Sequence, residues 1–274
     1  MADPLWMELR QFAQKMAWPT AKAAAPESRG VYEAGLDIVN SYSGDPAVLV
    51  KALRQFAQCQ SAAYANAGIA AALMIGSYLR GDTYDQNGLR EAELFLRKAQ
   101  EAVPDRAEIN FLNAKLELMR QNDGNARKLL NELHKKYPPN FHVLSVELWY
   151  WYNQRNLTFA EKTYERLRPC ADTQARQLQA ANQIAGCYRA CNDLDKSLMA
   201  YREILEIDPQ DPWNWHNLSL IQIEKGDFLE AEKSNEKALR LMDFPAARQT
   251  QRFLQEKNKK GDFWKKAGGL FGSK

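Results

Sequence analysis

The sequence predicts an all-α fold, a solenoid of repeated helix pairs with a concave groove along its inner face. Two observations carry this prediction. A small residue recurs at a spacing of 34 positions, and apolar residues keep helical spacing along most of the 274-residue chain. No long segment alternates apolar and polar residues as a strand would. One helix pair cannot bury its apolar face alone, but stacked pairs can, and the stack presents a curved surface to partners.

Residues 1–60 contain three stretches with helical apolar spacing, at residues 4–17, 30–42 and 47–60. The segments "WPTAKAAAPESR" and "SGDP" separate them and are typical of loops and turns. The N-terminal stretch "MADPLWMELRQFAQKM" carries acids and bases and lacks a long apolar run, so it does not resemble a secretory signal. We expect these helices to form a degenerate repeat or an N-terminal cap.

Residues 61–79 form the longest run without a charged residue, close to the length of a membrane span. The run is rich in alanine and contains Asn66, so it is only weakly hydrophobic. Its small residues would let a neighbouring helix approach closely. We therefore expect a buried, closely packed helix, and a membrane span is the alternative.

A small residue in the second half of each unit defines the repeat over residues 61–244. These small residues are Ala92, Ala126, Ala160, Ser197 and Ala231. Successive members are 34 residues apart, except that the step from Ala160 to Ser197 is 37 and predicts three extra residues near 168–173. The turn of the unit around Phe111 is one residue short, so its helix register stays open by one position.

This pattern resembles the tetratricopeptide repeat, a helix-turn-helix unit. Two tandem units carry the resemblance because they place large, small, aromatic and turn residues where the motif has them. The first unit contains Ala181, Ile184, Ala185, Tyr188, Asp193, Leu194, Ser197, Tyr201, Ile204 and Pro209. The second contains Trp215, Leu218, Ser219, Gly226, Asp227, Phe228, Ala231 and Ala238. The resemblance implies a right-handed solenoid of about five such repeats, followed by a capping helix at residues 245–258 that begins at Pro245.

The residues give no support to catalysis or to a cofactor. Histidine occurs only at His134, His142 and His216, and there is no phosphate-binding glycine loop and no HExxH motif. Cys187 and Cys191 lie one helical turn apart and, with Cys170, could form a soft metal site. Paired CxxC motifs are absent, so small buried residues are the favoured interpretation and we expect no metal. We therefore predict a protein that is not an enzyme.

Composition limits the class of partner and the compartment. The four cysteines are few and scattered, which favours a reducing compartment and a cytoplasmic protein. Basic residues are mostly balanced by acids along the helices, and no nucleic-acid-binding motif is present, so nucleic acid is disfavoured. Residues 248–274 are the exception, with eight basic and two acidic residues. A partner of this end would be acidic or anionic.

In the resembled family, the first helix of each pair lines the groove. The residues of this chain at the groove-facing motif positions are His142, Ser145, Trp149, Tyr152, Asn153, Gln179, Asn182, Arg189, Trp213, His216, Leu220 and Ile223. Their mixed aromatic, polar and apolar character suits a peptide segment or a partner helix. The clamp for terminal carboxylates known in this family needs paired Lys and Asn residues, but Gly186 stands where the second Asn would follow Asn182. The sequence therefore argues against that ligand.

Four consecutive aromatic residues, "WYWY" at 149–152, divide between two roles in this register. Trp151 occupies the core aromatic position that Tyr188 has in the next unit. Trp149 and Tyr152 occupy groove positions. Tyr150 occupies neither and is expected to pack against an adjoining repeat. The stretch is therefore predicted to separate core from groove on one helix.

The C-terminal tail, residues 259–274, is the second candidate contact. It places aromatic and aliphatic side chains among lysines, notably Phe263, Trp264, Lys265, Lys266, Leu270 and Phe271. Three interpretations stay open: a solubilising end, a short motif that docks on a protein, and an anchor on the inner membrane surface. Lysines favour anionic lipid, and aromatic rings settle at the headgroup level.

Overall fold

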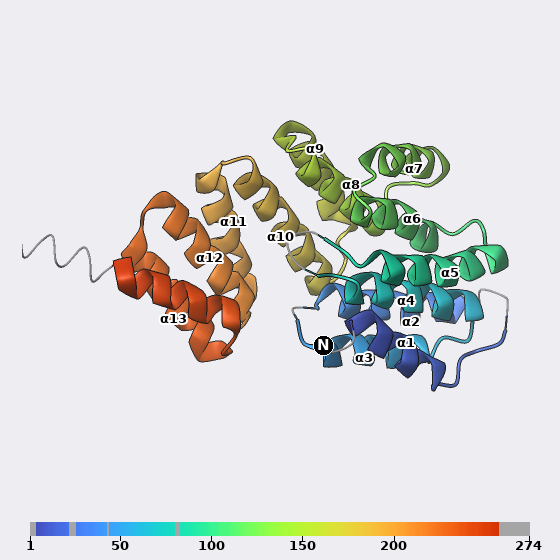
Figure 1. Ribbon diagram of the computed structural model, residues 1–274. Coiled ribbons are helices and arrows are strands. Elements are labelled where there is room, and N and C mark those ends of the chain that lie inside the picture. The colour runs from blue at the N-terminus through green and yellow to red at the C-terminus, as the bar shows by residue number, and fades with distance from the viewer. Residues whose placement is uncertain (1–3, 22–25, 43, 80–82, 258–274) are drawn as a thin grey trace, which may run out of the picture. The chain divides into compact units, whose positions relative to one another are not determined.

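The computed structural model describes residues 4–21, 26–42, 44–79 and 83–257 (Figure 1). Throughout these ranges the regular elements are helical, apart from one antiparallel bridge between Tyr78 and Tyr84. The predicted all-α helical-repeat fold is confirmed. The first helices are α1 (Leu5–Gln14), α2 (Pro26–Asn40), α3 (Pro46–Phe56), α4 (Ala62–Gly76), α5 (Gln86–Ala102), α6 (Ala107–Met119), α7 (Asp123–Lys136) and α8 (Phe141–Asn153). They are followed by α9 (Leu157–Leu167), the 3₁₀ turn η1 (Arg168–Cys170), α10 (Gln174–Ala190), α11 (Leu194–Ile207), α12 (Pro212–Lys225) and α13 (Phe228–Leu241).

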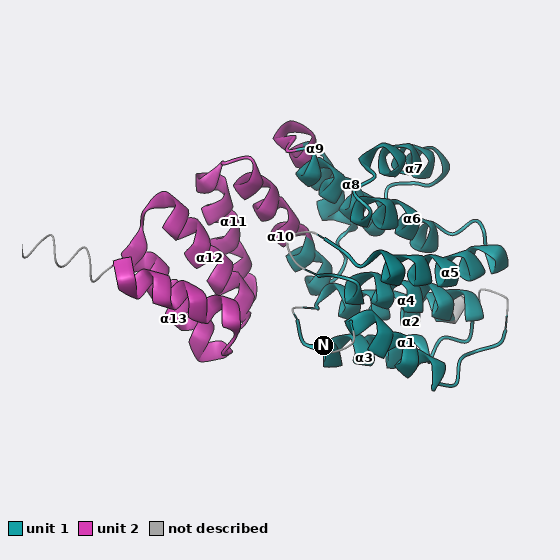
Figure 2. Cartoon of the chain, viewed as in Figure 1, with its two compact units in different colours: residues 1–154, 162–179 teal, residues 155–161, 180–274 magenta. Residues whose placement is uncertain are grey.

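The chain divides into two compact units (Figure 2). Unit 1 comprises residues 1–154 and 162–179, and unit 2 comprises residues 155–161 and 180–274. Helices α9 and α10 each contribute to both units. After α13, residues 245–257 are helical and close the described part of unit 2.

Helix α4 is the centre of unit 1, and it is the closely packed helix that the alanine-rich run predicted. The Phe56 ring of α3 lies against Gly35 of α2 and Gly68 of α4, and a Cβ added at either glycine would come within 2.2 Å of that ring. Gly76, at the end of α4, lies in the same way against Leu9. No helix of the described residues is long and apolar enough to span a bilayer.

The recurring small residues mark the contact between the two helices of each pair. Ala92, Ala126, Ala160, Ser197 and Ala231 are all buried, with at most 1% of their surface exposed. The Ser197 hydroxyl also donates a hydrogen bond to the Ala185 carbonyl at 2.9 Å, which joins α11 to α10. The period therefore reflects one packing requirement, a small side chain where two antiparallel helices approach.

The turn between the two helices repeats as regularly as the small residue. Gln121, Arg155, Asn192 and Gly226 each end a first helix with a positive φ. Gln121 and Arg155 are 34 residues apart, as are Asn192 and Gly226. This fixes the register that the sequence had left open: α6 aligns with α8 at a spacing of 34. The 3₁₀ turn η1 lies where the three extra residues were expected.

The segment "TYDQNG", residues 83–88, has a composition typical of a loop, but the whole segment does not precede the second helix of its unit. Helix α5 instead begins at Gln86 because the Asp85 carboxylate caps it, accepting hydrogen bonds from the backbone N–H groups of Asn87 at 2.8 Å and Gly88 at 3.1 Å.

Candidate functional site

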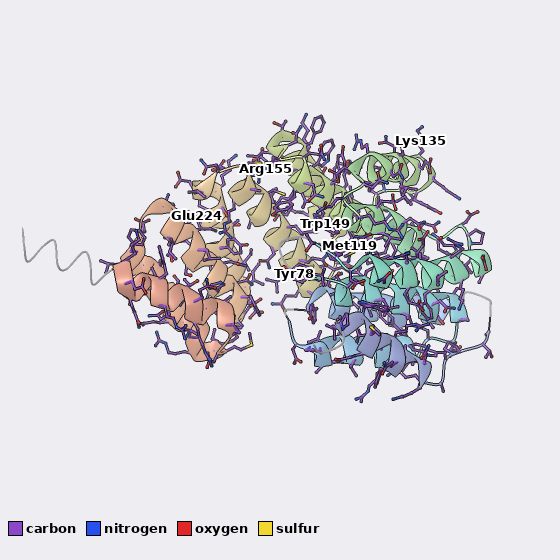
Figure 3. All side chains as sticks on the ribbon, viewed as in Figure 1. Tyr78, Met119, Lys135, Trp149, Arg155 and Glu224 are labelled. Carbon is purple, nitrogen blue, oxygen red and sulfur yellow. The ribbon has the colours of Figure 1, made fainter. Side chains whose placement is uncertain are left out.

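Helix α8 carries the predicted groove residues of unit 1, and it begins because Asn140 caps it by accepting a hydrogen bond from the Val143 N–H at 3.1 Å. Trp149 and Tyr152 are partly exposed, and Asn153 is exposed. His142 and Ser145 are buried. The exposed part of this face is therefore its C-terminal half, around Trp149, which Figure 3 labels.

The neighbouring aromatic residues divide as the register predicted. Trp151 is only 8% exposed, and the Arg127 guanidinium of α7 lies 4.8 Å from the centre of its ring. Tyr150 packs edge-on against Trp151 at 4.8 Å and also lies near Arg127. Trp151 is confirmed as a core residue, and Tyr150 contacts the adjoining helix pair.

Glu147 takes the place where the motif usually has leucine, and the structure gives it partners. Its carboxylate lies 3.0 Å from His134 Nε2, 3.4 Å from Arg166 and 3.8 Å from Arg127, so three cationic or hydrogen-bonding groups from α7 and α9 surround it. Burial raises the pKa of Glu147, but the hydrogen bond from His134 and the charges of His134 and Arg166 outweigh burial and lower it overall. Through these contacts Glu147 of α8 is linked to both α7 and α9.

The first turns of α10 close unit 1 through polar contacts. Gln179 donates a hydrogen bond to the Ser145 hydroxyl at 3.1 Å. Arg176, with 7% of its side chain exposed, lies 3.0 Å from Glu33 and 3.3 Å from Asp37, both on α2. Asp172 approaches the same guanidinium at 2.9 Å. Arg176 is 139 residues from Asp37 and 143 residues from Glu33 in the sequence, so these contacts join distant segments of the chain.

His142 lies beside these groups and is neutral. Its ring stacks on Phe111 of α6, with centroids 4.8 Å apart and planes 17° apart. Burial, followed by the charge of Arg176, lowers the pKa of His142 to about 3. The sequence missed Phe111 and its neighbours on α6 as inner-face residues because the register of that unit was open. The 34-residue spacing from α8 would have identified them.

In unit 2, helices α10 and α12 carry the other predicted residues. Asn182, Leu220 and Ile223 are partly exposed. Arg189 forms an ion pair with Glu224 of α12 at 2.5 Å, and Figure 3 labels Glu224. This pair joins the two inner-face helices near their C-terminal ends.

Trp213 and His216 form a small cluster at the start of α12. The Trp213 and Phe244 rings have centroids 4.3 Å apart, and His216 packs edge-on against Phe244 at 5.4 Å. His216 is buried, and its Nδ1 lies 3.2 Å from the side-chain oxygen of Asn235. Burial lowers the pKa of His216. The structure thus places these two residues against the terminal helix.

The described residues include neither the predicted tail contacts nor a metal-binding cluster. The predicted tail contacts, Phe263, Trp264, Lys265, Lys266, Leu270 and Phe271, lie outside the described residues. Within the described ranges there is no group of three or more His, Cys, Asp or Glu residues placed to hold a metal ion. Burial raises the pKa of the Cys187 thiol to about 12, which makes Cys187 a poor thiolate ligand.

Comparisons with known proteins agree with this architecture. Two models of the tetratricopeptide repeat match residues 178–211 and 200–233. The Cut9–Hcn1 hetero-tetramer of APC/C superposes with a TM-score of 0.60 and 11% identity, covering 91% of this chain and 48% of that one. A human IFIT1 dimer with m7Gppp-AAAA superposes with a TM-score of 0.59 and 16% identity, covering 77% and 50%. This chain therefore spans about half the length of each of those two.

A further solved structure, YrrB, is described as a tetratricopeptide-repeat protein with an unusual peptide-binding site. It aligns at 16% identity over 74% of this chain and 97% of its own, with a TM-score of 0.46. No curated protein matches the chain in sequence. The superpositions on Cut9–Hcn1 and IFIT1, with TM-scores of 0.60 and 0.59 at low identity, show a common fold and nothing about ligands.

Proposed function

We propose that the chain is an interaction scaffold of the tetratricopeptide-repeat superfamily and that it binds a peptide segment or partner helix along the first helices of its repeats. The two models of this repeat that match residues 178–211 and 200–233 support the proposal. The observation that carries the proposal is the division of α8. Trp151 is buried in the core, whereas Trp149 and Tyr152, two motif positions on the same helix, keep part of their surface for a ligand. Large aromatic side chains are frequent anchors in protein interfaces.

Each unit carries its own proposed contacts. In unit 1 these are Trp149, Tyr152 and Asn153, which combine ring surface with hydrogen-bonding groups, together with Gln179 at the start of α10. In unit 2 they are the apolar Leu220 and Ile223 and the polar Asn182 and Arg189. His142, Ser145, Trp213 and His216 shape the surface from beneath, as their burial or ring packing supports.

The experiment is a pulldown from lysate of the source organism with the full chain as bait. The double variant Trp149→Ala/Tyr152→Ala should lower the recovery of a specific partner by about tenfold or more. The matched control is Leu94→Ala/Phe159→Ala, which removes two side chains that are 50% and 46% exposed on the second helices of their pairs. The proposal fails if both double variants retain every partner equally.

The tail supplies the second proposed contact. Its lysines and aromatic residues support docking on an acidic protein surface, and they equally support the alternative, a peripheral assembly factor held on the inner membrane face. Deleting residues 259–274 separates the two. Loss of sedimentation with anionic liposomes would support the membrane tether, whereas unchanged sedimentation together with loss of a protein partner would support docking.

We further infer a non-catalytic, cytoplasmic role. Tetratricopeptide repeats are typically interaction modules, and the described residues hold no metal-binding cluster. A hydrolase or transferase activity that persists in purified protein and disappears on substitution of a single His or Cys would contradict this inference.

A further inference from the structure

Lys115 occupies the inner-face position of α6 that Trp149 occupies on α8, because the two residues are 34 apart in aligned helices. One helical turn before it, Phe111 stacks on His142 of α8. Lys115 is also close enough to His142 for its charge to lower the pKa of that histidine. The face formed by Phe111, Lys115 and His142 is called the α6–α8 recess below.

Lys115 differs from the other cations on this side of unit 1. Arg29 and Arg176 are both bound to the Glu33 carboxylate, at 2.8 and 3.0 Å. Lys115 has no hydrogen bond or ion pair to any residue that the structure describes. Its side chain is nevertheless mostly covered, and burial lowers its pKa to about 8. A partly reachable ammonium group without a partner is costly to bury and is suited to receive an anion.

His142 supplies a second group without a partner. Only 6% of its surface is exposed, and its Nε2 atom is buried with no hydrogen-bond partner among the described residues. Of the four charged groups that act on it, Arg176, Lys115 and Arg29 are cations and Glu33 alone is an anion. Three of these four charges are therefore positive, which favours an anion beside the His142 ring.

We propose that the α6–α8 recess receives the carboxylate of an aspartate or glutamate side chain from the bound segment. The carboxylate accepts a hydrogen bond from the Lys115 ammonium and lies beside the neutral ring of His142, whose buried Nε2 has no partner among the described residues. The single charge of Lys115 matches the single negative charge of a carboxylate better than the double charge of a phosphate. The inference rests on the proposed peptide binding and narrows its ligand to segments with an acidic residue at one fixed position.

The test is selection of a phage-displayed library of random peptides on the full chain. The expected binders share an Asp or Glu at one position. A Glu→Gln change in a selected peptide should weaken its binding to the wild-type chain by about tenfold or more. The same change should matter little for the Lys115→Met variant. Lys135→Met is the matched control, because Lys135 is exposed on α7 (labelled in Figure 3) and should leave the selection unchanged.

The outcomes separate this inference from the function on which it rests. Selected peptides that need Trp149 and Tyr152 but share no acidic position would contradict carboxylate binding at the α6–α8 recess and leave the proposed peptide binding intact. A selection that yields no binders would overturn both. Circular dichroism of Lys115→Met checks that the variant folds, and Lys115→Arg, which keeps the charge, should retain the acidic preference.

The pH dependence gives an independent check. Binding needs protonated Lys115 and an ionised ligand carboxylate, so affinity for an acidic peptide should be constant between about pH 6 and pH 8. It should fall by about tenfold per pH unit well above pH 8, where Lys115 loses its proton. The facing groups titrate elsewhere: the pKa of Glu33 is lowered, those of Arg29 and Arg176 are raised, and that of His142 is about 3.

One further pair faces this side of unit 1. Tyr64 of α4 donates to Glu108 of α6 at 2.8 Å, and burial raises the pKa of Tyr64 far above neutrality.

Lys115→Arg should abolish the loss of affinity near pH 8, because a guanidinium stays charged. An equal loss in that variant would show that another group is responsible.

Discussion

Unit 1 and unit 2 are both built from repeated helix pairs, but different kinds of contact stabilise the packing of helices within each unit. In unit 2 the stabilising residues stand at motif positions: Ser197 and Ala231 between paired helices, and Gly226 in the turn. In unit 1 Ala92 and Ala126 take the same motif position, but other close contacts have no motif position. The Phe56 ring lies against two glycines, and Arg176 binds carboxylates on α2.

The difference explains why only part of the chain is recognisable as a repeat. A motif records contacts that every unit makes, and such contacts recur with the period. A contact made once, such as that between Arg176 and Glu33, leaves no periodic trace. The two family-model matches accordingly cover residues 178–233 and none of the helices of unit 1 before α10.

The strongest test of this comparison is Arg176→Met. It leaves Asp37 without its cation and Glu33 with Arg29 alone, which should cost about 3–5 kcal/mol of unfolding free energy. Hydrogen exchange should accelerate in α2 and the start of α10 but not in α12 and α13. Arg97→Met, which removes an exposed pair with Glu93 in the same unit, should cost less than about 1 kcal/mol. Equal losses of unfolding free energy in Arg176→Met and Arg97→Met would contradict a special role for the Arg176 contacts in unit 1.

A second test uses two glycines of one helix. Gly35→Ala places a methyl group 2.2 Å from the Phe56 ring, so we expect a loss of about 1–3 kcal/mol in chemical denaturation. Gly30→Ala, also on α2, meets no atom within 4 Å and should gain about 0.5–1 kcal/mol from helix propensity. Stabilisation by both variants would show that the close packing of α2, α3 and α4 is not limiting.

These contrasts also show what the sequence could and could not predict. The 34-residue period predicted the paired helices of the repeat and the burial of Trp151, because both depend on local spacing. The inner face of α6 was missed because Gln121 takes the left-handed turn position that glycine has at Gly226. A non-glycine residue rarely adopts that conformation, so the turn was hidden. The Arg176 contacts depend on tertiary structure and have no local signal.

Within unit 2, Asn235 tests whether a non-repeating polar contact also matters there. Its side chain is fully buried, approaches His216 Nδ1 at 3.2 Å, and donates to the Ala247 carbonyl and to Gln251, both at 2.9 Å. Asn235→Ala leaves buried partners unpaired and should cost about 1–2 kcal/mol. Ser234→Ala, at the neighbouring buried position, is the control and should change stability by less than about 0.5 kcal/mol. If Asn235→Ala leaves the free energy of unfolding unchanged, the helix at residues 245–257 is held by its apolar contacts alone.

The smallest expected effect is that of Glu147→Gln in unit 1, and it has a pH signature. The pKa of Glu147 is lowered in the folded chain, so its ionised form stabilises unit 1 above the unfolded-state pKa of about 4.3. That contribution is lost as the pH falls through the lower folded-state pKa. The variant should therefore be less stable than the wild type by about 1 kcal/mol near neutrality, and the two denaturation curves should converge in acid. A difference that stays constant down to the acid transition would mean that the loss in the variant does not come from the charge of the Glu147 carboxylate.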